Sequence, residues 1–271
     1  MPKTVVITGA SDGIGAAAAR RLVDGGHHVV VVGRSAAKTK AVADELGVHC
    51  FVADFAHLHQ VHTLAAQLAD HYPRIDVLVN NAGAILGDRH VTADGFEETF
   101  QVNYLAPFLL TNLLLDTLLA SQALVLQTSS NAARLSARVD LDDLNNAQNY
   151  SPVRAYGNAK LELVLFTREL HDRYHEQGLS AAAFHPGGVS SNFARTSRSP
   201  VGSLFRTPVP RLFSSPRRRR HGSCCGSSPR HPGTASCPVH TTKTANRAPQ
   251  LDERCLGLRR TAARGPIESP S

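Results

Sequence analysis

The chain has 271 residues, enough for one large domain with a sizeable core, and a formal net charge of +7. The charge is uneven, because residues 201–271 hold 13 lysines and arginines against 3 acidic residues, whereas residues 1–200 hold 16 against 19. No apolar run reaches the roughly 18 residues of a membrane span, and the N-terminus lacks the pattern of a signal peptide, so we expect neither.

Six apolar runs alternate with helical patterns as far as residue 188. The predicted strands are TVVITGA (4–10), HHVVVVGR (27–34), VHCFVAD (48–54), RIDVLVNNAG (74–83), QALVLQTSS (122–130) and LSAAAFHPGG (179–188). The predicted helices span 14–26, 35–46, 57–72, the leucine-rich 105–119, and 155–174. Continuously apolar strands separated by helices indicate a parallel sheet covered on both faces. The sequence therefore predicts an α/β fold with a doubly wound, mostly parallel sheet, the Rossmann arrangement.

The turn after the first strand is rich in glycine. Glycines there permit a tight turn and a close approach of the backbone to a pyrophosphate, and the free N–H groups of the following helix face the phosphates. Because the turn joins a strand to a helix, we interpret it as a dinucleotide site rather than a purely structural turn. The candidate residues are Thr8, Gly9, Ser11, Asp12, Gly13, Ile14 and Gly15.

The ends of the second and third strands bear on which dinucleotide binds. Arg34 follows the second strand, with Lys38 one turn on and no acidic residue nearby. An arginine there attracts a 2′-phosphate, which predicts NADP(H) rather than NAD(H); the less favoured alternative is that Arg34 is a solvated loop cation. Asp54, followed by Phe55, ends the third strand. Two interpretations of Asp54 remain open, an acceptor for the adenine amino group or a cap of the next helix.

Tyr156 and Lys160 stand four residues apart in a predicted helix, which puts a phenol and an ammonium on one face. A tyrosine that serves as an acid or base at neutral pH needs its pKa lowered from about 10. A neighbouring cation lowers it in that direction. Taken alone, this spacing is common and is more often an exposed helix face than a site.

The order of several motifs resembles that of the short-chain dehydrogenase/reductase family. The motifs are Thr8 to Gly15, Asn80 to Gly83, Asn103, Ser129-Ser130, Tyr156 with Lys160, and Pro186-Gly187. The resemblance covers about residues 4–213. The segments FQVNYLAPFLLTNLLL and AYGNAKLELVLFTREL are most similar to the retinol-dehydrogenase-like branch and its bacterial relatives.

The resemblance implies an NADP(H)-dependent oxidoreductase that interconverts an alcohol and a carbonyl on a small or lipophilic substrate. In that scheme Tyr156 is the acid/base and Lys160 lowers its pKa and binds the nicotinamide ribose. Ser130 hydrogen-bonds the carbonyl oxygen, and Asn103 holds a relay water. Further cofactor contacts are implied for Asn81, Ala82 and Gly83 on the adenosine side and for Pro186, Gly187, Val189 and Ser191 beside the nicotinamide.

Partners and compartment follow from residue usage and from the family. The single cysteine before residue 200, Cys50, fits a reducing cytoplasm. His57, His59 and His62 lack the spacing of metal ligands and are read as an exposed helix face, so no metal is expected. The family implies a homo-oligomer through the helix at 104–119.

The chain departs from the family near its C-terminus, where a further helix and a seventh strand are expected. Residues 191–213 still resemble a substrate-covering segment, but residues 214–271 are rich in Arg, Pro, Ser and Cys, with no apolar period. We therefore expect a catalytic domain over residues 1–200, with six strands and the seventh missing. Residues 201–271 are then a disordered basic tail.

The composition of the tail allows three interpretations. The arginines at 217–220 suggest nucleic acid or anionic lipid, but aromatic residues are absent after Phe213. The four tail cysteines lack paired ligand spacing, which argues against a metal module. The third interpretation, a shifted reading frame, is favoured because codons that the genetic code allows for residues 222–226 read as an apolar run in another frame. If so, the alternative function is a catalytically weak or inactive dinucleotide-binding protein.

Overall fold

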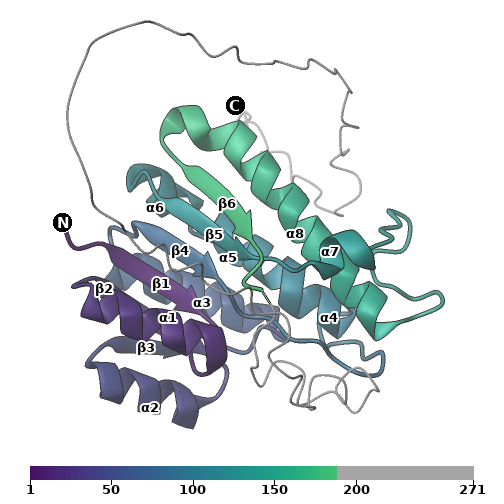
Figure 1. The fold of residues 1–271 in the computed structure, drawn as a ribbon, viewed down its shortest axis with the longest axis horizontal. Coiled ribbons are helices and arrows are strands. Elements are labelled where there is room, and N and C mark those ends of the chain that lie inside the picture. The colour runs from purple at the N-terminus through teal and green to yellow at the C-terminus, as the bar shows by residue number, and fades with distance from the viewer. Residues whose placement is uncertain (188–271) are drawn as a thin grey trace, which may run out of the picture. The chain divides into compact units, whose positions relative to one another are not determined.

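The computed structural model describes residues 1–187, which form a six-stranded sheet with helices on both faces (Figure 1). The strands are β1 (Thr4–Thr8), β2 (His28–Gly33), β3 (His49–Val52), β4 (Val77–Asn80), β5 (Leu124–Thr128) and β6 (Ser180–Phe184). Their order is β3-β2-β1-β4-β5-β6, and every neighbouring pair is parallel. The predicted doubly wound parallel sheet is confirmed. The predicted loss of a seventh strand concerns residues outside the described part.

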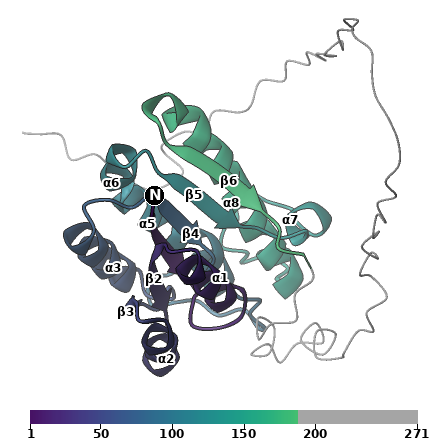
Figure 2. The same cartoon turned by 60° about the vertical axis from the view of Figure 1, so that its left-hand side comes forward.

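The two faces of the sheet are covered by different helices. Helices α1 (Gly13–Asp24) and α2 (Ala36–Leu46) pack on one face (Figures 1 and 2). Helices α3 (Leu58–His71), α5 (Ala106–Leu113) and α8 (Pro152–Tyr174) pack on the other, where the larger core lies. The chain reverses its winding direction between β1 and β4, and ligands of such sheets bind at the carboxyl ends of the strands on either side of that point.

The leucine-rich helix begins earlier than the sequence predicts and is interrupted. Glu97 accepts hydrogen bonds from the backbone N–H groups of Thr99 and Phe100, so the helix begins as α4 (Glu98–Phe100). It continues as a π-helical segment, η1 (Gln101–Leu105), and then as α5. Leu114 leaves helical geometry before α6 (Leu115–Ala120). Buried polar residues at 99, 101 and 103 interrupt the apolar pattern, so the sequence does not predict that the helix begins here.

Two further short helices follow strands or helices that the sequence predicts. They are α7 (Ala132–Leu135), after β5, and a 3₁₀ turn, η2 (His175–Gln177), after α8. Across residues 1–187, no helix is long and apolar enough to cross a membrane.

Candidate active site

The glycine-rich turn has the shape that its sequence predicts. Gly9 has a φ of +65°, and a β-carbon at this position would lie 2.7 Å from the Cα of Ala82. A β-carbon on Gly15 would collide with the Gly9 carbonyl oxygen and crowd the Asn81 amide. Only glycine fits these positions without displacing the backbone. The turn therefore lies against the end of β4, in the tight conformation that a pyrophosphate-binding turn of this fold has.

Thr8 and Asn81 hold this turn in place. The Thr8 hydroxyl accepts hydrogen bonds from the backbone N–H groups of Asn81 and Ala82, both at 3.0 Å. In return the Asn81 side-chain amide donates to the carbonyl oxygens of Thr8 and Gly9. Since Thr8 is fully buried, these bonds fix the ends of β1 and β4 against each other. The two predicted motifs therefore form one unit.

Asp12 caps α1 through its side chain, which accepts from the N–H of Gly13 at 2.7 Å. Its other carboxylate oxygen lies 3.4 Å from the Lys38 side-chain nitrogen, on the solvent-exposed surface. Ser11 lies beside Gly33, where a β-carbon would touch its hydroxyl. The start of α1 is thus joined to the end of β2.

Arg34 stands directly after β2 and is exposed. Within residues 1–187 it has no ion-pair partner, so its guanidinium is available to a ligand at this edge. This exposed position fits the predicted contact to a 2′-phosphate, as it fits the alternative of a solvated loop cation.

Asp54 does not cap α3. One of its carboxylate oxygens accepts from the N–H of Ala56 at 3.0 Å, which forms a local turn before the helix. The N-cap residue of α3 is His57, without a side-chain bond, and the N–H of Leu58 donates instead to Asp94. Of the two interpretations of Asp54, the helix cap is therefore wrong. Asp94, which lies 36 positions away in sequence, accepts the hydrogen bond at the start of α3 instead. No local sequence pattern could indicate this partner.

Tyr156 and Lys160 lie one turn apart on α8, buried beside the end of β5. The Lys160 side chain, 2% exposed, donates to the carbonyl oxygen of Thr128 at 3.0 Å. Its nitrogen lies 5.6 Å from the centre of the Tyr156 ring. A hydrogen bond joins Tyr156 to Ser130, and the neighbouring Ser129 donates to the backbone of α8. The spacing of the two residues brings them together with the predicted serine.

The pKa values of this pair differ from the sequence-based expectation. Burial raises the pKa of Tyr156 to about 12, and the hydrogen bond with Ser130 opposes this only in part. Burial lowers the pKa of Lys160 to about 7. Desolvation disfavours the charged form of each group. The sequence predicts that Lys160 lowers the pKa of Tyr156; instead, burial keeps that pKa above its ordinary value.

Asn103 lies on the π-helical segment and is fully buried. Its amide nitrogen donates to the carbonyl oxygens of Ala84 and Thr99, and its amide oxygen accepts from the N–H of Ala84. A β-carbon on Gly83 would collide with Asn103 and lie 3.2 Å from the Lys160 nitrogen. Asn103 therefore fixes the loop after β4 next to the lysine. Both amide protons of its side chain are bound to backbone carbonyl oxygens, and its amide oxygen accepts one hydrogen bond.

The remaining predicted residues are distributed as follows. Phe55 is buried next to Asp54 and Ile14 is half-buried in the first turn of α1. Pro186 and Gly187 follow β6 after one intervening residue, His185, and Gly187 has a φ of +86°. Val189 and Ser191 lie outside the described residues, as does the tail.

Two buried carboxylates near the site were not singled out from the sequence. Glu97 is fully buried, and Glu162 on α8 is almost so, with one carboxylate oxygen that has no hydrogen-bond partner among residues 1–187. Burial, followed by the negative charge of Glu97, raises the pKa of Glu162 to about 8. A glutamate two positions after a lysine in an amphipathic helix is usually exposed, so the sequence pattern did not indicate that Glu162 is buried. Among residues 1–187 no group of His, Cys, Asp and Glu is arranged to hold a metal ion.

Comparison with known proteins agrees with this geometry. The family model for short chain dehydrogenases matches residues 3–201. The chain belongs to the short-chain dehydrogenase family. Its similarity to named retinol dehydrogenases supports the retinol-dehydrogenase-like branch.

Individual members of the family give the extent of the likeness. A protein of Streptomyces sp. (strain C5), provisionally named a daunorubicin C-13 ketoreductase, is 40% identical over 71% of this chain and 68% of its own length. Human retinol dehydrogenase 13 is 37% identical over 71% of this chain and 61% of its own length. A short chain dehydrogenase from Shigella flexneri, solved with NADP, is 28% identical, with a TM-score of 0.56 over 69% of this chain and 77% of its own.

Short-chain dehydrogenases with such names are oxidoreductases of alcohols and carbonyl compounds. Nothing in the comparisons favours the alternative of an inactive dinucleotide-binding protein. The chain spans about three fifths to two thirds of the length of the first two relatives, so the activity of those whole proteins is carried over below only as a proposal.

Proposed function

We propose that the protein is an NADP(H)-dependent oxidoreductase that interconverts an alcohol and a carbonyl compound. The observation that carries the proposal is the burial of Tyr156 and Lys160 together at the end of β5, with the half-buried Ser130 beside Tyr156. The same edge of the sheet holds the glycine turn at Gly9 and Gly15. A nicotinamide dinucleotide bound there supplies or accepts the hydride.

The chain's own residues then have separable roles. Ser130, already bonded to Tyr156, orients the substrate oxygen toward the phenol. Tyr156 donates a proton to that oxygen in reduction and accepts one in oxidation. Lys160 stabilises the phenolate whenever it carries its charge, because an opposite charge within a few ångströms favours ionisation. Asn103 keeps the Gly83–Ala84 backbone in place beside Lys160.

The preference for NADP(H) rests on Arg34. Its guanidinium is exposed at the end of β2, the position from which this fold discriminates the two dinucleotides. The Shigella relative solved with NADP supports the same choice. At the adenosine end we assign Asp54 and Phe55, with Asn81 to Gly83 beside them, and at the nicotinamide end Pro186, Gly187, Val189 and Ser191.

The substrate class is proposed from the names of the relatives. A retinol dehydrogenase and a daunorubicin ketoreductase are named for bulky, largely apolar substrates. We therefore propose a lipophilic alcohol or carbonyl. We further propose that the protein works in a reducing cytoplasm. Residues 1–200 would form the catalytic domain and residues 201–271 a separate tail. Two copies would pair through α5. Leu113 on α5 and Leu165 on α8 are exposed apolar residues consistent with such pairing.

The test is oxidation of NADPH in the presence of a panel of apolar aldehydes and ketones. Tyr156→Phe should lower turnover at least about 100-fold, the usual contribution of a general acid. Tyr72→Phe is the matched control, because Tyr72 lies at the far edge of the sheet, bonded to His49. Equal rates in the wild type and Tyr156→Phe would overturn the proposal.

A further inference from the structure

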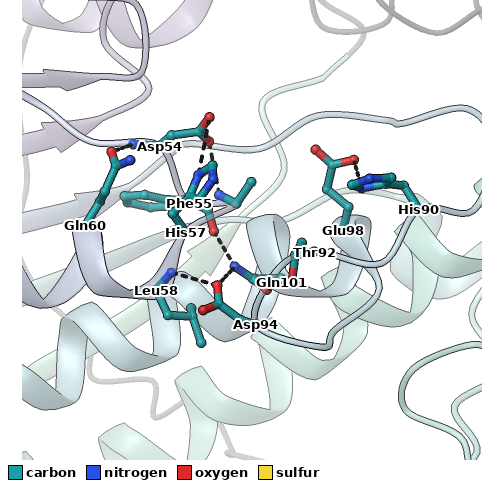
Figure 3. Close-up of polar contacts among 11 residues, drawn as sticks. Asp54, Phe55, His57, Leu58, Gln60, His90, Thr92, Asp94, Glu98 and Gln101 are labelled. Carbon is teal, nitrogen blue, oxygen red and sulfur yellow. Dashed lines mark hydrogen bonds and ion pairs between the residues drawn. The ribbon is translucent and has the colours of Figure 1, made fainter.

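Gln101 is a fully buried residue on the π-helical segment, and its side-chain amide joins three parts of the chain (Figure 3). The amide nitrogen donates to the carbonyl oxygen of Phe55 at 3.1 Å and to Asp94 at 2.9 Å. The amide oxygen accepts from the hydroxyl of Thr92 at 2.6 Å. Both polar atoms of the side chain are thus satisfied by groups that lie 7 to 46 positions away in sequence.

The turn at residues 54–57 depends on such distant groups for its position. Within the turn, Ala56 and His57 donate their N–H groups to Asp54. Gln60, on α3, accepts from the N–H of Asp54 at 2.9 Å. These bonds shape the turn and attach it to its own helix, and the N–H of Ala53 just before it donates to the carbonyl oxygen of Gly33 on β2. None of them joins the turn to the π-helical segment that carries Asn103. Gln101 makes that connection through the Phe55 carbonyl.

Asp94 strengthens the connection. One of its carboxylate oxygens accepts from both the N–H of Leu58, at the start of α3, and the amide of Gln101. The hydrogen bond from Leu58, and to a lesser extent that from Gln101, lowers the pKa of Asp94. The carboxylate therefore stays charged at neutral pH and holds both donors. Figure 3 shows these side chains converging between the turn and η1.

The same π-helical segment also carries Asn103, two residues further on. Asn103 fixes Ala84, next to Gly83 and Lys160, at the catalytic end of the site. Gln101 fixes Phe55 at the opposite end. One short segment thereby sets the distance between the two ends of the predicted cofactor site.

We propose that Gln101 is a positioning residue for the adenine end of the cofactor, acting through the Asp54–Phe55 turn. The inference rests on the proposed function, because it takes the turn as the adenine subsite. It predicts that loss of the Gln101 amide loosens the turn in the ligand-free chain and weakens the binding of any ligand that carries the adenine end.

The experiment compares Gln101→Leu with Gln127→Leu. Gln127 is also fully buried, but neither polar atom of its side chain has a hydrogen-bond partner among residues 1–187. Amide exchange of residues 54–58 is measured without ligand, and the dissociation constants of NADPH and adenosine 2′,5′-bisphosphate are measured by titration. Gln101→Leu should speed the exchange and raise both dissociation constants at least about tenfold. Gln127→Leu should do neither.

A milder variant guards against misfolding. Thr92→Val removes only the hydroxyl that orients the Gln101 amide, and it should shift both readouts in the same direction by a smaller factor. Unchanged exchange in Gln101→Leu, or faster exchange with unchanged affinity for the bisphosphate, would overturn the positioning role. Failure of the wild type to bind NADPH and the bisphosphate would instead overturn the proposed function, and this proposal with it.

Discussion

The side-chain nitrogen of Lys160 lies 5.6 Å from the centre of the Tyr156 ring, and both side chains are buried. Burial holds the pKa of the lysine at about 7 and that of the tyrosine at about 12. At neutral pH the site therefore carries a neutral phenol and an only partly charged amine. The protonation of Lys160 is the property of the site that is most sensitive to pH near 7.

Burial of Lys160 should lower the free energy of unfolding by an amount that depends on pH. Its folded pKa of about 7 lies below the unfolded value of 10.5, so the unfolded chain binds more protons between these values and stability rises with pH. The full cost, present below pH 7, corresponds to about 5 kcal/mol at most. Lys160→Met should raise the free energy of unfolding at pH 6–7, with a gain that disappears toward pH 10. Urea unfolding of both proteins across this pH range tests the prediction. An increase in the free energy of unfolding that is the same at every pH would contradict it.

Glu162 should act with the opposite sign. Its folded pKa of about 8 lies above the unfolded value of 4.5, so the folded chain binds more protons in this window and stability falls as pH rises through it. Glu162→Gln should therefore raise the melting temperature at pH 8 and leave it nearly unchanged at pH 4.5. Glu169→Gln, at an exposed position on the same helix, serves as the control. A variant that melts like the wild type at pH 8 would show that Glu162 is better solvated than its burial indicates.

The glycine turn allows a comparison of two positive-φ positions. Gly9 and Gly47 have φ values of +65° and +64°, but a β-carbon meets Ala82 at Gly9 and nothing within 4 Å at Gly47. Gly47→Ala should lose about 1 kcal/mol of unfolding free energy, the cost of the backbone conformation alone. Gly9→Ala should lose clearly more and should also weaken NADPH binding, which Gly47→Ala leaves intact. Equal losses of unfolding free energy in the two variants would mean that β4 can move away from the new β-carbon at position 9 without an energetic cost.

Arg34 should determine the choice of dinucleotide. Arg34→Asp removes the cation and places a ribose acceptor at the end of β2, so NADPH affinity should fall at least tenfold while NADH affinity rises. Arg21→Asp makes the same charge change at an exposed position on α1 and should leave the ratio unchanged. Tighter binding of NADH than NADPH by the wild type would refute the role given to Arg34.

Local patterns predicted the strands, the glycine turn and the Tyr156–Lys160 pair because each depends on residues within a few positions of one another. The start of the helix at Glu98 was missed because its cap and its buried polar residues interrupt the apolar period. Asp94 and Gln101 were missed for a different reason: their partners lie far away in sequence. Likewise, the pair's spacing predicted proximity but not burial, and burial decides the direction of both pKa values.

The central proposal is hydride transfer with Tyr156 as the acid. The most direct measurement uses NADPH deuterated at the transferable position of the nicotinamide, with an apolar aldehyde as acceptor. Wild-type protein should place deuterium on the carbinol carbon of the product. Tyr156→Phe should bind NADPH with wild-type affinity but transfer the label at least about 100-fold more slowly. Binding of NADPH by the wild type without label transfer to any carbonyl of the panel would contradict it.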